Sequence, residues 1–258
     1  MRKNFMKKVV AGMLTAVMAF SLTACGGGDA STNDTAKEEG SSDVITVGFS
    51  QVGAESDWRT ANSESMKSTF STENGYNLIF DDAQQKQENQ IAAIRNFIQQ
   101  EVDYIVLAPV TESGWDTVLQ EAKDAEIPVI IVDRMVDVSD DSLYTAWVGS
   151  NFKLEGQKAC EGLKQYAAAK NMSEVNIVDI QGTIGASAQI GRTEALNEAV
   201  EANGWNLLAQ QTGEFTQAKG QEVMESMLKQ YDNINVVYCE NDNEAFGAIE
   251  AIKAAGKT

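Results

Sequence analysis

An unusual group of side chains follows the first apolar segment of the folded part of this 258-residue chain. The segment GFSQVGAESDWRTA, residues 48–61, contains Glu55, Ser56, Asp57, Trp58 and Arg59. A large aromatic ring beside a guanidinium is poor chemistry for a tight turn, and the charges are poor chemistry for a core. A carboxylate accepts hydrogen bonds and a guanidinium donates them, whereas a sugar hydroxyl does both. The group is therefore suited to holding a small polyol.

Polar side chains also follow three later apolar segments. Asp133 and Arg134 end the run IPVIIVDR, Arg192 follows VNIVDIQG, and Asn241 follows INVVYCE. Taken singly, each has an ordinary alternative: a surface ion pair for Asp133 and Arg134, a solvated helix face for Arg192, and a helix N-cap for Asn241. Trp58 alone would be a core residue at a helix start. Their recurrence after successive apolar segments favours a shared binding site.

The elements that position these residues alternate between two patterns. The apolar runs ITVGFS, YNLIF, VDYIVLAPV and IPVIIVD are separated by segments with helical periodicity, such as Ile91, Ile94 and Ile98 in QENQIAAIRNFIQQ. After a less regular crossing, YTAWVGSN, the runs VNIVDIQG, NLLAQQTG and INVVYCEN continue the pattern. Apolar strands that alternate with helices predict an α/β protein with doubly wound parallel sheets, which bind ligands at the carboxyl ends of their strands. The break near Asn151 predicts two lobes, 44–150 and 151–258.

The N-terminal segment has the pattern of an export signal. Four cations, Arg2, Lys3, Lys7 and Lys8, precede the apolar run VVAGMLTAVMAFSL, which is shorter than the ~20 residues that a spanning helix needs. The run ends in LTAC, which resembles the bacterial lipobox, so we expect residues 1–24 to be a signal peptide and Cys25 to be lipidated. The alternative is an ordinary signal peptide with a chance cysteine. Residues 25–43, rich in Gly, Ser, Thr and acids, are predicted to form a disordered tether.

The composition excludes several classes of function. The formal net charge of −18 opposes binding to nucleic acid. The chain has no histidine, which removes Ser-His-Asp and Cys-His catalysis and histidine metal sites. We therefore expect no metal and no cofactor. Cys160 and Cys239 lie in apolar patterns where free cysteine packs as a small hydrophobe, although a disulfide between them is left open.

Long segments of the chain resemble a known family. They are VGFSQVGAESDWR, DAQQKQENQIAAIRNFI, LAPVTESGWDTVLQEAKDAEIPVIIVDR, DIQGTIGASAQIGR, KGQEVMESMLKQ and NDNEAFGAIEAIKAAGK. The chain resembles the sugar-binding proteins of bacterial ABC importers, in the ribose- and galactose-type group of periplasmic binding proteins, and within it the galactofuranose-binding members. The resemblance implies a two-lobe type I fold and a monomer without enzymatic activity. It would capture a monosaccharide, galactofuranose or a related sugar, and deliver it to a membrane permease from a lipid anchor on the outer side of the bacterial cell membrane.

The resemblance also implies roles for the polar residues. Glu55, Ser56, Trp58 and Arg59 would contact the sugar from the first lobe together with Asp133 and Arg134, and Arg192 and Asn241 would contact it from the second. Trp58 would lie against the apolar C–H face of the sugar ring. Asp57 stands where those proteins have glycine and adds an acid beside the site. We expect Trp58 and Arg59 to serve the ligand more than the core.

The end of the chain departs from the family pattern. The resemblance implies further strands and helices beyond IKAAGKT. We therefore expect a truncated second lobe with three strands and an open edge.

Two other functions compete with transport. A glycoside hydrolase would use Glu55 and Asp133 as its carboxylate pair. The neighbouring Arg59 and Arg134 oppose this, because they stabilise an ionised carboxylate whereas a general acid must hold a proton. A transcription factor with the same sensor fold would need a DNA-binding segment before the domain, where the sequence has a lipobox. We therefore favour transport.

Overall fold

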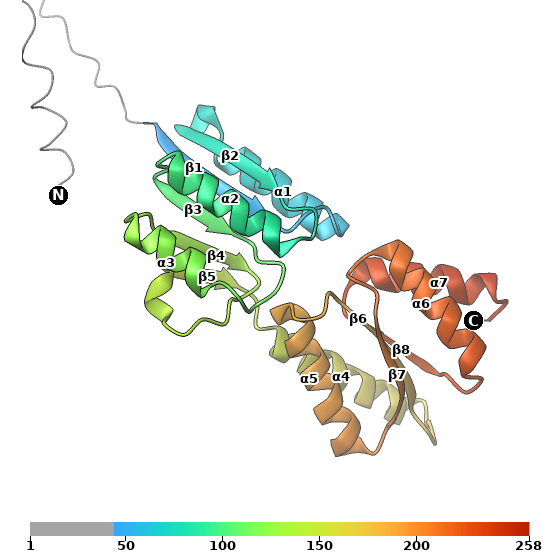
Figure 1. Ribbon diagram of the computed structural model, residues 1–258. Coiled ribbons are helices and arrows are strands. Elements are labelled where there is room, and N and C mark those ends of the chain that lie inside the picture. The colour runs from blue at the N-terminus through green and yellow to red at the C-terminus, as the bar shows by residue number, and fades with distance from the viewer. Residues whose placement is uncertain (1–43, 258) are drawn as a thin grey trace, which may run out of the picture. The chain divides into compact units, whose positions relative to one another are not determined.

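Two separate parallel sheets form the framework of residues 44–257, which are the residues that the computed structural model describes (Figure 1). Both sheets belong to the same structural unit, Ser42–Thr258. The predicted signal peptide, the lipidation site Cys25 and the predicted tether up to residue 43 lie outside the described residues. Those predictions remain untested by the structure.

The first sheet has five strands in the order β2-β1-β3-β4-β5, and all of its paired strands are parallel. The strands are β1 Ile45–Gln51, β2 Tyr76–Asp82, β3 Tyr104–Leu107, β4 Val129–Asp133 and β5 Ala146–Gly149. From the sequence, we expected the segment around β5 to be an irregular crossing. That interpretation was wrong, because Ala146–Gly149 pairs in register with Ile130–Asp133 and extends the sheet.

Three helices cover the two faces of this sheet (Figure 1). They are α1 Asp57–Thr69, α2 Gln87–Gln99 and α3 Asp116–Asp124, with short 3-10 turns at Thr72–Asn74 and Asp141–Leu143. Helices α2 and α3 bury Ile94, Phe97 and Leu119 against one face. Met66 of α1 packs against Val47 and Phe49 on the other face. Each face therefore has its own apolar core, and the strand ends are left free for polar groups.

The second sheet has three parallel strands in the order β7-β6-β8. Its strands are β6 Asn176–Gln181, β7 Asn206–Thr212 and β8 Val236–Cys239, and its helices are α4 Phe152–Ala169, α5 Ser187–Asn203, α6 Gln217–Gln230 and α7 Asp242–Ala254. Helices α4 and α5 pack on one face, and α6 and α7 on the other (Figure 1). Among the described residues, β7 and β8 are the two edges of this sheet.

The second sheet repeats the layout of the first three strands. The order β7-β6-β8 reproduces β2-β1-β3, with the strand that comes first in the chain at the centre. The turn after the second strand of each series has two consecutive residues in the left-handed region: Gln84 and Gln85 (φ 53° and 60°) after β2, and Glu214 and Phe215 (57° and 60°) after β7. Non-glycine residues rarely adopt this conformation. The same strained turn therefore precedes α2 and α6.

Side-chain caps start several helices at the carboxyl edges of the sheets. Ser56 caps α1 by accepting from Arg59 N, Asn151 caps α4, and Asn241 caps α7 by accepting from Glu244 N. Each cap satisfies a backbone N–H of the first helical turn. Asn241 thus has the capping role that the sequence allowed as its alternative.

The predicted α/β architecture with parallel sheets and a three-stranded second sheet is confirmed.

Cys160 and Cys239 are both free, so the two described cysteines form no disulfide. Burial raises the pKa of the Cys160 thiol to about 11 and that of Cys239 further still. In residues 44–257, no helix combines the length and the apolar character needed to cross a membrane.

Candidate ligand-binding site

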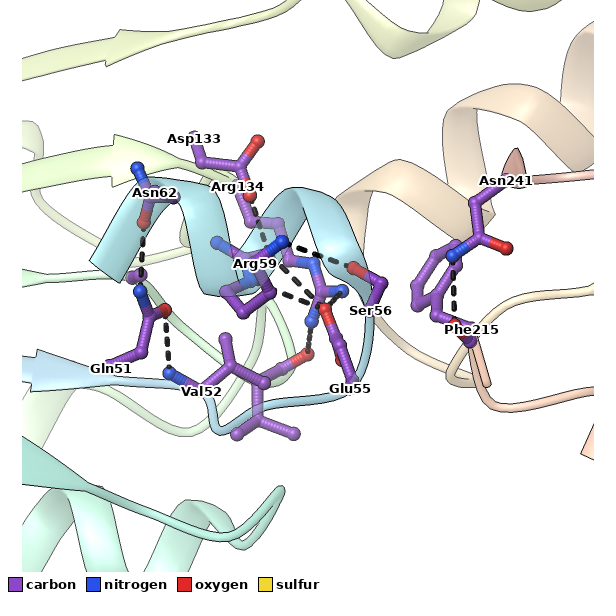
Figure 2. A network of polar contacts seen from close by, with 12 residues as sticks. Gln51, Val52, Glu55, Ser56, Arg59, Asn62, Asp133, Arg134, Phe215 and Asn241 are labelled. Atoms are coloured by element: carbon purple, nitrogen blue, oxygen red, sulfur yellow. Dashed lines mark hydrogen bonds and ion pairs between the residues drawn. The ribbon is translucent and has the colours of Figure 1, made fainter. Parts of the chain in front are cut away.

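A cavity of about 140 Å³ lies where the carboxyl ends of β1 and β4 approach residues from the second sheet. Its lining residues come from helices, loops and strand ends of both lobes: Glu55, Ser56, Trp58, Arg59, Asp133, Arg134, Ser150, Phe152, Glu155, Ala188, Arg192, Phe215 and Asn241. Eight of the nine predicted ligand-binding residues are in this set, and Asp57 is the exception. Figure 2 shows the polar contacts among several of them.

Glu55 is at the centre of the charged network from the first lobe. Its Oε1 accepts from Nε and Nη2 of Arg59, both at 3.3 Å, and from Nη2 of Arg134. The side chains of all three residues are 2–3% exposed. Because a buried charge is costly unless it is paired and hydrogen-bonded, the three groups stabilise one another.

Asp133 closes the network from the end of β4. Its Oδ2 accepts from Nη2 of Arg59 at 2.6 Å, as Figure 2 shows, and its backbone has φ 62°. Aspartate tolerates the left-handed region better than most residues, although the conformation still stores some strain. The turn ends the strand and lets consecutive residues, Asp133 and Arg134, both line the cavity.

Three buried polar atoms in this network have no hydrogen-bond partner among the described residues. They are Oε2 of Glu55, Nη1 of Arg59 and Nε of Arg134. An unsatisfied buried polar group costs on the order of 1–3 kcal/mol, so such groups are rare in folded proteins. All three residues line the cavity, so one carboxylate acceptor and two guanidinium donors without partners belong to side chains at its wall.

Arg134 also connects the two lobes. Its guanidinium lies 4.7 Å from the ring centroid of Phe215, and its Nη1 donates to the backbone oxygen of Val110 at 3.4 Å. Burial lowers the pKa of Arg134, and the Glu55 carboxylate opposes that shift. A guanidinium remains charged in proteins, so Arg134 is a fixed cation of the site.

The second lobe provides an arginine that is oriented by other groups. Nη1 of Arg192 donates to the backbone oxygen of Glu240 at 2.6 Å, and Nη2 donates to Oε2 of Glu155 at 2.9 Å. The guanidinium lies 5.0 Å from the centroid of Phe152. Arg192 is therefore held by three partners, which favours a positioned donor over a freely solvated helix side chain.

Ser56 and Asn241 have structural partners already. Ser56 Oγ accepts from Arg59 N at 3.2 Å. Asn241 Oδ1 accepts from Glu244 N at 2.8 Å, and its Nδ2 donates to the backbone oxygen of Phe215 at 2.8 Å. The Ser56 hydroxyl proton and the second Asn241 amide proton are still available as donors.

Trp58 and Asp57 differ in their relation to the cavity. Trp58 is 56% exposed, lines the cavity, and lies with its ring centroid 4.8 Å from the Arg59 guanidinium. Asp57 instead lines a neighbouring cavity of about 420 Å³ together with Trp58. Its side chain pairs with Asn243, so a direct ligand contact by Asp57 remains a prediction with little support from its position.

Arg59 is more buried, and makes more contacts within the fold, than the sequence led us to expect. We predicted that this side chain serves the ligand more than the core, but Arg59 is 2% exposed and holds both Glu55 and Asp133. Arg59 therefore stabilises the fold as well as lining the cavity.

Five lining residues were not predicted from the sequence: Ser150, Phe152, Glu155, Ala188 and Phe215. Phe152 and Phe215 are the two aromatic residues that the second lobe brings to the lining. Phe215 interrupts the polar turn TGEFTQ with one large apolar side chain, a signal that could have been noticed. No local pattern distinguished Phe152 and Glu155 from ordinary residues of a helix.

Three buried carboxyl groups lie behind the second-lobe residues. Burial raises the pKa of Asp179 to about 7, and those of Glu240 and Glu244 to about 8. Glu240 accepts from Gly182 N at 2.8 Å, and Glu244 accepts from Phe215 N at 2.9 Å. These acids support the backbone that carries Phe215 and receives Arg192, and they do not line the 140 Å³ cavity.

The charges in the cavity balance. Its lining has three acids, Glu55, Asp133 and Glu155, and three arginines, so their formal sum is zero. Residues 44–257 contain no cluster of three or more acid or cysteine side chains that could hold a metal ion. The arrangement is suited to a neutral ligand that has both donors and acceptors.

The fold and this site agree with the comparison to known proteins. The chain belongs to the periplasmic binding protein family, because the family's domain pattern matches residues 47–258. Proteins of this family bind solutes without transforming them, which supports the expectation of a protein that is not an enzyme.

Individual relatives are 47–48% identical to this chain over the matched residues. The galactofuranose-binding protein YtfQ of Escherichia coli is 47% identical over 216 residues, which cover 82% of this chain and 67% of that protein. A Mycobacterium smegmatis protein solved with β-D-fucofuranose is 48% identical, with a TM-score of 0.80, and the match covers 83% of this chain and 70% of that one. The binding protein of an arabinose ABC transporter from Shewanella sp. ANA-3, solved with L-arabinofuranose, has 48% identity and a TM-score of 0.76, with the same coverage.

Proposed function

We propose that this protein captures a neutral monosaccharide in its furanose form between the two lobes and delivers it to the permease of an ABC importer. Galactofuranose is the leading candidate, and arabinofuranose and fucofuranose are related ones. The similar proteins support this proposal, since their names or bound ligands are galactofuranose, β-D-fucofuranose and L-arabinofuranose.

The observation that carries the proposal is the set of unpartnered atoms on the residues that line the cavity. Glu55 Oε2 can accept a hydroxyl proton, while Arg59 Nη1 and Arg134 Nε can donate to hydroxyl oxygens. Hydrogen bonds to charged groups are shorter and about twice as strong as neutral ones. A sugar with neighbouring hydroxyls would satisfy all three atoms and remove the cost of leaving them buried and unpaired.

The other functions have less support. In a glycoside hydrolase one carboxyl group must donate a proton to the leaving group. Glu55 accepts from two arginines and Asp133 from one, so both carboxyl groups are used as acceptors. The geometry favours binding over acid catalysis.

The transport role also concerns the part of the chain outside the described residues. We infer that Cys25 carries the lipid anchor and that the protein works as a monomer on the outer side of the bacterial membrane. Two acyl chains on a lipidated cysteine suffice for stable anchoring, and the tether 25–43 would leave the lobes free to reach the permease.

A thermal-shift screen tests the proposed ligand class. The sugars are galactofuranose, L-arabinose, D-ribose and D-galactose, with galacturonic acid and a sugar phosphate as charged controls. We expect the melting temperature to rise for a furanose-forming neutral sugar, because a ligand that binds the folded state stabilises it. A response to charged sugars alone, or to none of these sugars, would overturn the proposal.

A further inference from the structure

The first turns of α1 and α7 are joined by two reciprocal hydrogen bonds. The backbone N–H of Asp57 donates to Oδ1 of Asn243 at 3.1 Å, and Nδ2 of Asn243 donates to Oδ2 of Asp57 at 3.3 Å. The two residues are 186 positions apart in the chain, and each belongs to a helix that follows a strand of a different sheet. The pair therefore links the two lobes directly.

Each partner is adjacent to residues of the cavity. Asp57 lies between Ser56 and Trp58, and Asn243 is two positions after the N-cap Asn241. Ser56, Trp58 and Asn241 all line the 140 Å³ cavity. The pair thus fixes the distance between two helix starts that carry ligand-facing residues, without itself lining that cavity.

The surroundings make the pair energetically significant. Asn243 is 9% exposed, and no hydrogen bond other than those to Asp57 is found for its side chain among the described residues. Separation of the lobes at this point would leave a largely buried amide without partners until water reached it, which costs free energy. The Asp57 carboxylate also lies at the N-terminal ends of two helices, where a negative charge is favourable.

The pair is placed beside both cavities. Asp57 and Asn243 line the 420 Å³ cavity, which shares Trp58, Arg192 and Asn241 with the smaller one. We propose that the Asp57–Asn243 pair is an interlobe latch, a pair of positioning residues that slows the release of a captured ligand without touching it. The latch rests on the proposed function to the extent that a ligand is captured between the lobes.

The chemistry of the pair allows an exchange experiment. Asn243→Asp replaces the only side-chain donor with a second carboxylate facing Asp57. Asp57→Asn keeps a side-chain acceptor oxygen for Asn243. The double variant Asp57→Asn/Asn243→Asp restores one donor and one carboxylate in exchanged positions, and the new carboxylate at position 243 can still accept the backbone N–H of residue 57. Gln99→Glu adds a negative charge at an exposed position at the end of α2 and is the control.

The measurements are the dissociation rate of L-arabinose and D-galactose by stopped-flow tryptophan fluorescence, and the radius of gyration by small-angle scattering with and without sugar. We expect the sugar to dissociate from Asn243→Asp about tenfold faster than from the wild type, a rate ratio that corresponds to about 1.4 kcal/mol. We also expect this variant to have a larger radius of gyration. Asp57→Asn should have little effect on the dissociation rate or the radius of gyration. The double variant should bring both quantities back towards the wild-type values, and Gln99→Glu should have the wild-type values.

The latch is refuted if Asn243→Asp has the dissociation rate and the radius of gyration of the wild type. It is also refuted if the double variant releases sugar as fast as Asn243→Asp does. Failure of the proposed function is distinguishable from failure of the latch. If no variant binds either sugar but the radius of gyration still follows the expected order, the latch stands and the ligand assignment fails. If all variants bind and release sugar alike, the ligand assignment stands and the latch fails.

Discussion

At the scale of single residues, the site depends on three charged side chains that serve both fold and ligand. Glu55 pairs with both Arg59 and Arg134, yet each of the three side chains leaves one polar atom without a partner among the described residues. A network of this kind is costly when it is incomplete. We interpret the missing bonds as those that the ligand makes.

Trp58 and Arg59 are adjacent but should respond differently to substitution. Trp58→Ala removes a ring that is 56% exposed, so the free energy of unfolding should change by less than about 0.5 kcal/mol. Sugar affinity should fall by about 1–2 kcal/mol through lost contact area. Calorimetric titration and urea unfolding of the unliganded variant measure the two effects.

Arg59→Ala should reduce both the free energy of unfolding and the affinity for sugar. It leaves Asp133 without its arginine partner and Glu55 with Arg134 alone, and breaking a buried ion pair costs about 3–5 kcal/mol. The same unfolding experiment provides the check. If Arg59→Ala unfolds at the urea concentration of the wild type, the network is not part of the fold.

At the scale of elements, a close approach of two turns positions Phe215. A Cβ on Gly182, the residue after β6, would lie 1.9 Å from Cζ of the Phe215 ring. That ring is 2% exposed and stacks with Arg134. The absence of a side chain at Gly182 therefore makes room for Phe215, one of the two aromatic residues that the second lobe brings to the cavity.

Gly182→Ala should displace this ring. We expect a loss of stability of about 1–3 kcal/mol from overpacking, together with weaker sugar binding. Gly162 in α4 is the matched control, since a Cβ there meets nothing within 4 Å. Gly162→Ala should leave binding unchanged and stabilise the helix by up to about 1 kcal/mol. Equal behaviour of the two variants would contradict the role given to Gly182.

The buried acids of the second lobe predict a pH dependence of stability. The folded-state pKa of Glu244 is raised to about 8 and that of Asp179 to about 7, above the values of an unfolded chain. The folded state therefore holds these protons more tightly, so the stability that they contribute is complete below about pH 4 and is lost as pH rises towards 8. Each unit of pKa difference corresponds to about 1.4 kcal/mol.

Glu244→Gln tests this dependence because the amide imitates the protonated acid and keeps an oxygen for Phe215 N. The free energy of unfolding of the wild type should fall between about pH 5 and pH 8, and the variant should have a shallower slope. Glu201→Gln on the exposed face of α5 is the control and should keep the wild-type slope. A variant slope as steep as that of the wild type would show that Glu244 is not protonated in the folded state.

The elements and the site were predictable from sequence to different degrees. Glu55 and Asn241 follow strands that are continuous apolar runs, and Asp133 is the last residue of another. The carboxyl-end rule then indicated where a ligand binds. Strand β5 was missed because Ala146–Gly149 is short and exposed. The pairing of Asp57 with Asn243 depends on how two helices that begin 186 residues apart meet, which no local pattern contains.

At the scale of the whole molecule, membrane attachment depends on the N-terminal segment. We expect Cys25→Ser to move the protein from the membrane fraction to the soluble fraction of a bacterial host, because the thiol that would carry the acyl chains is gone. Cell fractionation with immunodetection measures the distribution, and Cys160→Ser is the control because Cys160 is buried in the second lobe. An unchanged distribution of Cys25→Ser would contradict the lipobox interpretation.

The central claim is that three unpartnered atoms of one buried network are the groups that hold a sugar. The most direct test is a crystal structure of the protein with galactofuranose or L-arabinose. Our account predicts sugar oxygens within hydrogen-bonding distance of Glu55 Oε2, Arg59 Nη1 and Arg134 Nε, with Phe152 or Phe215 against the ring. A sugar bound elsewhere, or water molecules on these three atoms while the sugar is bound, would contradict it.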